Sequence, residues 1–97
     1  MEHIEARELL AAEIAKYRGR TYAELAEMVG DPDHPAFEVL GQSGSRYWLE
    51  IEAFWDGLDH LSNVVRLRGA ICGSGIDYQV PLCDDFLKAA DGSFVDE

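Results

Sequence analysis

The sequence is poor in positive charge, and it has no long apolar run. Eight lysine and arginine residues stand against 19 aspartate and glutamate residues, so the net charge is -11 at pH 7. A surface that binds nucleic acid needs a basic patch to meet the phosphates, so we expect no nucleic-acid partner. A membrane-spanning helix needs about 18 or more consecutive apolar residues, and no window of the sequence approaches that length. We therefore expect no membrane span.

Cysteine is also scarce. Cys72 and Cys83 are too few for a disulfide framework, and their spacing is not that of a metal or redox motif. Neither has a neighbouring histidine in the sequence to activate it, so we expect two inert thiols. The acidic N-terminus lacks the charged-then-apolar layout of a secretory signal, and the simplest prediction is a cytoplasmic protein.

Two helices are predicted in the first third of the chain. Over residues 4–18, apolar residues recur at spacings of four, four and three, which is the stripe of an amphipathic helix. The stripe consists of Ala6, Leu10, Ile14 and Tyr17. A second helix is expected at about residues 22–29, because Thr21 and Glu24 have the spacing of a capping box.

From residue 36 the apolar pattern changes to alternation, which is typical of half-buried strands. The expected strands lie at about residues 36–41, 46–56, 63–72 and 76–82. The second is the longest and has an unbroken apolar row, so we expect it in the centre of the sheet. That row consists of Tyr47, Leu49, Ile51, Ala53 and Trp55.

The turns and the tail complete the predicted secondary structure. Gly44 is expected in the left-handed position of the first hairpin loop, and Gly73 with Ser74 fits a type II′ turn before the fourth strand. The tail, residues 84–97, is expected to hold a helical turn at 84–88 and a short final strand at Phe94 and Val95.

Together these elements predict a single α+β domain over residues 1–97. Hydrophobic residues make up 47% of the 97 residues, which suits one buried core. Two N-terminal helices are expected to pack on one face of a four- to five-stranded antiparallel meander. Inward positions then include Leu67 and Val80, paired across the third and fourth strands, while Glu50 is expected opposite Arg68 and Glu52 opposite Arg66.

Three short segments resemble a family of small uncharacterised bacterial proteins of unknown function. They are Thr21-Tyr22-Ala23-Glu24-Leu25, Phe54-Trp55-Asp56 and Asp91-Gly92-Ser93-Phe94-Val95. The resemblance covers most of the chain from Thr21 onward, and it implies a stand-alone bacterial domain. It brings no catalytic residue with it.

The outward positions of the two central strands form a candidate interaction surface. It consists of Trp48, Glu50, Glu52, Phe54, Val64, Arg66 and Arg68. One interpretation is a solvated face stabilised by cross-strand charge pairs. The other is a surface for a protein partner or a homodimer, since aromatic residues and arginine dominate interface hot spots.

No catalytic, cofactor-binding or metal site is predicted. Two loops, 31–34 and 56–60, each combine aspartate with histidine, but no spacing matches a known metal loop, and aspartate beside glycine or proline is ordinary turn chemistry. Whether these loops meet in space is left open by the sequence. Composition is therefore the only feature that would suggest a metal site in either loop.

For function, the sequence favours a non-enzymatic protein-binding or regulatory module that uses the outer sheet face. One alternative is a small ligand-binding protein or enzyme with a pocket between helices and sheet, holding polar groups such as Tyr17, Tyr22 and Tyr78. Another is an acidic inhibitor or immunity-type protein that neutralises a basic partner.

Overall fold

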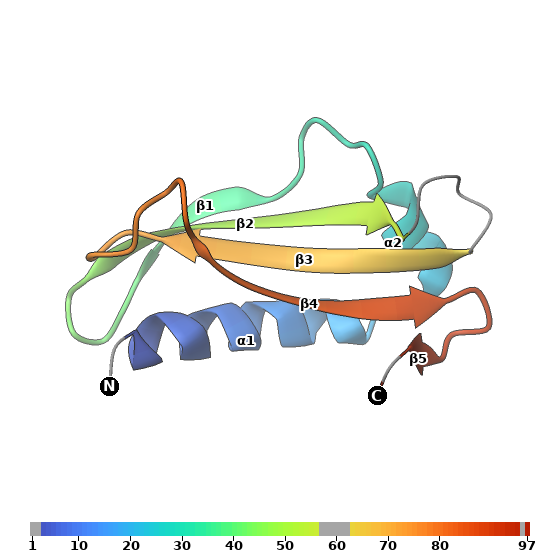
Figure 1. Ribbon diagram of the computed structural model, residues 1–97, viewed down its shortest axis with the longest axis horizontal. Coiled ribbons are helices and arrows are strands. Elements are labelled where there is room, and N and C mark those ends of the chain that lie inside the picture. Colours follow the sequence, from blue (N-terminus) through green and yellow to red (C-terminus); the bar gives the residue numbers. More distant parts are fainter. Residues whose placement is uncertain (1–2, 57–62, 96) are drawn as a thin grey trace.

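A computed structural model describes residues 3–56, 63–95 and 97, and it has the predicted α+β architecture (Figure 1). The elements are α1 (Ile4–Arg18), α2 (Tyr22–Glu27), β1 (Ala36–Leu40), β2 (Arg46–Trp55), β3 (Val64–Cys72), β4 (Leu82–Ala89) and β5 (Phe94–Val95). The strands form one antiparallel sheet in the order β1-β2-β3-β4-β5, a simple meander. The long strand has the predicted neighbour on each side, since β2 lies between β1 and β3.

Helix α1 has the predicted bounds and runs along the sheet beneath β3 and β4 (Figure 1). Its stripe of Ala6, Leu10, Ile14 and Tyr17 is buried, as predicted. The helix comes very close to β3 at Gly69. A β-carbon placed there would lie 2.8 Å from Leu10 Cδ1 and 3.0 Å from Ile14 Cδ1. The glycine thus lets the helix approach the inner face of the sheet.

Helix α2 begins with the predicted capping box. The backbone N–H of Glu24 donates to Thr21 Oγ1 at 3.1 Å, and the N–H of Thr21 donates to Glu24 Oε1 at 2.9 Å. The helix ends at Glu27, earlier than predicted, because Val29 already forms a parallel bridge with Ala53 of β2. The chain is thereby drawn onto the sheet before a further helical turn can form.

The register of β2 and β3 differs from the prediction by two residues. Glu52 lies opposite Arg68 and Glu50 opposite Ala70, whereas the predicted partners were Arg66 and Arg68. The prediction assumed a loop symmetric about Asp59, a residue outside the described part of the chain. Because side chains alternate with a period of two, a shift of two residues leaves every side chain on its predicted face.

The predicted fourth strand at residues 76–82 is wrong. Ser74 (φ 50°) and Gly75 (φ 92°) occupy the turn, one residue later than expected, and the ladder stops at a bridge between Gly73 and Ile76. The N–H of Val80 then donates to the Asp77 carbonyl at 3.0 Å, so the backbone turns instead of extending. Tyr78 and Val80, both predicted to face inward, are each 75% exposed.

The sheet resumes after Pro81, where β4 replaces the helical turn predicted at 84–88. In the observed register Ile71 lies opposite Leu82, and Leu67 lies opposite Phe86 instead of Val80. Phe86 is 3% exposed and occupies the position in the core that was predicted for Val80. The short final strand predicted at Phe94 and Val95 is confirmed as β5, which pairs with the end of β4.

Candidate functional site

The predicted interaction surface lies on the sheet face opposite the helices. Core side chains occupy the alternate positions of β2 and β3, including Leu49, Ile51 and Leu67, and the predicted surface residues take the positions between them. They are Trp48, Glu50, Glu52, Phe54, Val64, Arg66 and Arg68. We call this side of the sheet the outer face. Trp48 and Arg68 are its most exposed predicted members, and the others are half-buried.

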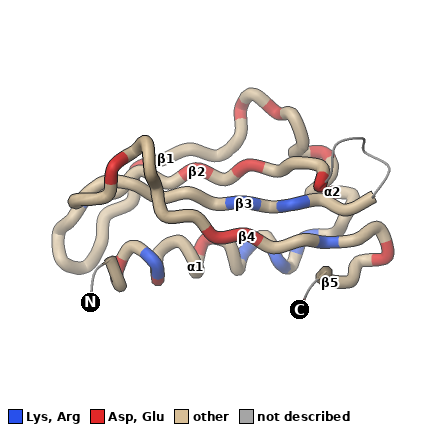
Figure 2. Tube along the Cα trace, in the orientation of Figure 1, with Lys and Arg blue, Asp and Glu red and all other residues tan. Residues whose placement is uncertain are grey.

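One half of the outer face is charged, and the arginines of β3 lie between acidic residues of β2 and β4 along the chain trace (Figure 2). Arg66 bonds to Asp56, with Nη2 3.0 Å from Oδ1, and also to Asp85 of β4. These hydrogen bonds raise the pKa of Arg66 above its usual range, and the bond to Asp56 has the largest effect. Arg68 lies over the Phe54 ring, 5.1 Å from its centroid, and its Nη2 is 4.0 Å from Glu52 Oε1. Both arginine charges are therefore balanced within the face.

The other half of the outer face is apolar. A shallow groove of about 250 Å³ is lined by Trp48, Glu50, Ala70, Ile71, Cys72, Tyr78 and Pro81. Trp48 is 45% exposed at this groove. Tyr78 and Pro81 were missed as outer-face residues because the segment containing them was predicted to be a strand with its apolar residues inward.

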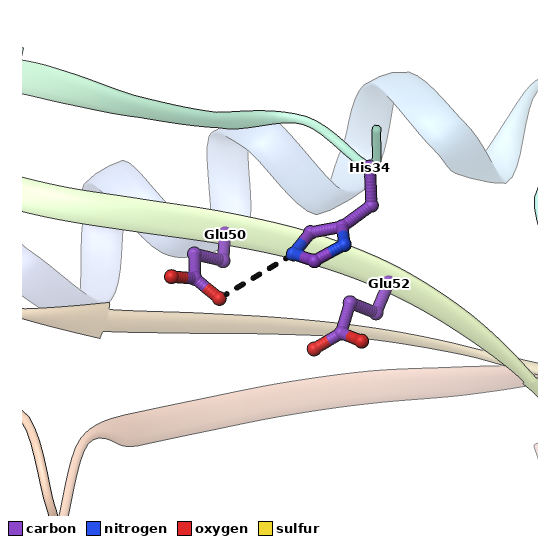
Figure 3. A group of neighbouring side chains, drawn as sticks. All are labelled: His34, Glu50 and Glu52. Atoms are coloured by element: carbon purple, nitrogen blue, oxygen red, sulfur yellow. Dashed lines mark ion pairs between the residues drawn. The ribbon is translucent and has the colours of Figure 1, made fainter. Parts of the chain in front are cut away.

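A third group of side chains joins the two halves (Figure 3). His34, from the loop before β1, lies over Glu50 and Glu52, with its Nε2 3.5 Å from Glu50 Oε2. One nitrogen or oxygen atom from each of the three residues falls within 4.8 Å of the others. Trp48 orients the Glu50 carboxylate of this group, because its indole N–H donates to Glu50 Oε1 at 2.8 Å. We call these three residues the His34 cluster.

The backbone explains why His34 reaches the sheet. The N–H of Ile51 donates to the Pro35 carbonyl at 2.9 Å, which continues the pairing of β1 and β2 past Ala36. His34 lies two residues before Ala36, so its side chain falls on the same side of the sheet as that of Ala36, which is the register partner of Glu50. The sequence prediction treated residues 31–34 as a solvated loop, although this alternation was available as a signal. The other predicted loop, 56–60, lies outside the described residues except for Asp56.

A second groove, of about 330 Å³, opens beside the His34 cluster. It lies between the end of α2, the following loop and the end of β2, and its polar lining includes Asp31, His34 and Glu52. The pocket predicted to contain three tyrosines is different, and the structure does not bring those residues together. Tyr17 is buried in the core, where burial raises its pKa, whereas Tyr78 is on the outer face. Tyr22 packs near Trp55, with ring centroids 6.4 Å apart.

Both cysteines are free thiols, with Cys72 half-buried and Cys83 exposed. Neither helix in the part of the chain that the structure describes has the length and hydropathy needed to span a membrane. Comparisons with protein-family models, with curated proteins and with solved structures find no match to the chain. No residue role can therefore be taken from a relative, and the geometry of the outer face carries the functional argument.

Proposed function

We propose that this protein is a non-enzymatic binding module that docks a basic protein partner on its outer face. The observation that supports this most directly is the exposed Trp48 beside an open groove, on a sheet face that the helices leave uncovered. Tryptophan is among the residues most enriched at interface hot spots, where burial of a large ring contributes much of the binding energy.

The apolar half of the outer face offers an anchor site. Trp48 and Tyr78 line one groove, and both keep much of their surface exposed in the isolated chain. A partner side chain of aliphatic or aromatic character would bury that surface, at about 25 cal/mol for each Å² removed from water. The acidic Glu50 lies at the edge of the same groove.

The charge of the chain favours a basic partner over a second copy. Arg66 and Arg68 are balanced by acidic neighbours within the face, whereas Glu38 stands exposed opposite Trp48. A second copy would bring another net charge of -11 to the interface. A partner with lysine or arginine beside an apolar residue would instead be attracted over long range. Such a partner would meet the protein in the cytoplasm, where the two free thiols remain reduced.

A peptide selection tests the proposal without a known partner. Random peptides displayed on phage are selected on the wild-type protein and counter-selected on a Trp48→Ala/Tyr78→Ala variant. We expect enriched peptides that combine lysine or arginine with an apolar residue, and we expect their association rates to fall steeply with added salt. Leu40→Ala is the matched control, because Leu40 is 66% exposed but does not line the groove.

Two results would contradict a basic partner at this surface. The first is a set of peptides that bind the double variant as well as the wild type, or whose association rate does not change with ionic strength. The second is a dimer seen by light scattering after size exclusion that Trp48→Ala abolishes with the fold intact. That dimer would make a second copy of the chain the occupant.

A further inference from the structure

We propose that the His34 cluster is a zinc-binding site, with His34, Glu50 and Glu52 as the protein ligands. This goes beyond the docking function, because it assigns a metal to side chains at the border of the apolar and charged halves of the outer face. Imidazole nitrogen and carboxylate oxygen are common ligands of zinc, and three protein ligands are the number found where zinc keeps an open coordination position.

The geometry is close to that of a zinc shell. Zinc binds imidazole nitrogen and carboxylate oxygen at about 2.0–2.2 Å, so two ligand atoms of a tetrahedral site lie about 3.3–3.6 Å apart. His34 Nε2 and Glu50 Oε2 are already 3.5 Å apart. One Glu52 oxygen lies within 4.8 Å of a ligand atom of each of the other two residues. The backbone already brings the three side chains together, because Glu50 and Glu52 lie on β2 and the N–H of Ile51 between them donates to the Pro35 carbonyl, next to His34.

The cluster also has an outer layer of support. Trp48 holds Glu50 Oε1 at 2.8 Å, which leaves Oε2 directed at His34 (Figure 3). Hydrogen bonds of this kind orient metal ligands in known sites, and removing one typically lowers metal affinity by about 10–100-fold. Trp48 is thus a positioning residue for the metal, separately from its place in the groove.

Electrostatics favours a cation at this point. Glu50 and Glu52 project from the same face of β2, where their like charges repel, and a divalent ion between them would relieve that repulsion. Arg68 is the competing cation, but it lies 4.0 Å from Glu52 and also stacks over the Phe54 ring. The ligand side chains are 26–40% exposed, so an ion can reach them from solvent.

The ligand types favour zinc over calcium and magnesium. Three protein ligands leave one coordination position for a further ligand. A histidine among the ligands disfavours calcium and magnesium, which prefer oxygen alone, and suits zinc. The groove of about 330 Å³ is lined by two of these ligands, His34 and Glu52, and by Asp31. A water molecule or a partner carboxylate could take the fourth position from that groove.

A zinc titration tests the assignment. The protein carries Cys72→Ser/Cys83→Ser, because thiolates are the alternative zinc ligands, and zinc is titrated against a chromogenic chelator. We expect one zinc per chain, and we expect His34→Ala or Glu50→Gln to weaken binding by more than about tenfold. Each test variant has a control with the same change of residue type elsewhere. Glu38→Gln removes another outer-face carboxylate and is the control for Glu50→Gln. His3→Ala removes a histidine at the start of α1 and is the control for His34→Ala. Both should bind zinc like the parent.

Two further measurements separate a metal site from a structural role. Cobalt should give the visible spectrum of a nitrogen and oxygen site in the parent and lose it in His34→Ala, while circular dichroism shows both folded. Trp48→Phe keeps an aromatic side chain but removes the indole N–H that donates to Glu50, so it should lower zinc affinity by about 10–100-fold. The assignment is refuted if the parent binds zinc no more tightly than His34→Ala, or if Glu38→Gln loses as much affinity as Glu50→Gln.

Discussion

The ammonium group of Lys88 donates a hydrogen bond to the carbonyl oxygen of Arg20 at 2.6 Å, and it also reaches the Arg18 carbonyl at 3.4 Å. Lys88 projects from the inner side of β4 and is 8% exposed. The last carbonyls of a helix have no partner within the helix, and they carry its negative dipole end. The lysine thus connects β4 to the C-terminal end of α1, although the two are far apart in the sequence.

Replacing Lys88 with methionine should destabilise the protein by about 1.5–3 kcal/mol, the usual contribution of a hydrogen bond to a charged group. The stem of the side chain is kept, so the loss comes from the hydrogen bonds to the Arg18 and Arg20 carbonyls at the end of α1 and just after it. Urea unfolding measures it. Lys16→Met is the matched control, since the Lys16 side chain is 70% exposed, and it should change stability by less than about 0.5 kcal/mol. Equal effects of the two changes would contradict the connection.

Gly69→Ala should destabilise the protein by about 1–3 kcal/mol, the usual cost of adding a methyl group to a packed core. The new β-carbon would lie 2.8 Å from Leu10 Cδ1, so α1 or its side chains must shift. Thermal unfolding followed by circular dichroism measures the change. Gly19→Ala is the control, because its β-carbon would meet only the Lys16 carbonyl, at 3.9 Å, among the described residues. If both substitutions are neutral, the helix does not lie this close to β3.

Glu5 joins the start of α1 to the β1–β2 hairpin, and its contribution should depend on pH. The hydroxyl of Ser43 donates to Glu5 Oε1 at 2.7 Å and its N–H donates to Oε2 at 3.0 Å, and these bonds lower the pKa of Glu5 below 4.5. A lowered pKa in the folded state stabilises the protein above the unfolded value, and the effect is lost as the pH falls through the folded value.

Wild-type protein should therefore be more stable than Glu5→Gln at pH 7, and the difference should shrink as the pH falls below about 4.5. Urea unfolding at a series of pH values measures this. Glu38→Gln removes an exposed carboxylate of β1 and serves as the control for overall charge. A stability difference between wild type and Glu5→Gln that stays constant from pH 7 to pH 3 would contradict the bonded carboxylate.

Arg66→Gln should lower stability by less than about 1 kcal/mol at low salt, and by less still at high salt. The Arg66 side chain is 37% exposed, so solvent screens its pairs with Asp56 and Asp85. Urea unfolding at two salt concentrations measures both effects. A loss of several kcal/mol would contradict this, because it would mean that the ion pairs of Arg66 contribute strongly to the stability of the fold.

Local patterns in the sequence were sufficient for the helices and for the faces of the central strands. The stripe from Ala6 to Tyr17 fixes which side of α1 is buried, and the hydroxyl of Thr21 fixes where α2 begins. Alternation along β2 fixes which side chains point outward. These predictions hold because they depend on repeats of 3.6 and two residues within one segment.

Contacts between distant segments were decided only by the tertiary structure. Residues 76–82 alternate like a strand, but the sheet instead pairs β3 with Leu82–Ala89, because Phe86 fills the core and Lys88 meets the end of α1. A period of two also allows registers that differ by two residues, so the sequence alone could not choose the partner of Glu52. The meeting of His34 with Glu50 depends on the pairing of β1 with β2, a contact between separate segments, and so it was established only by the folded chain.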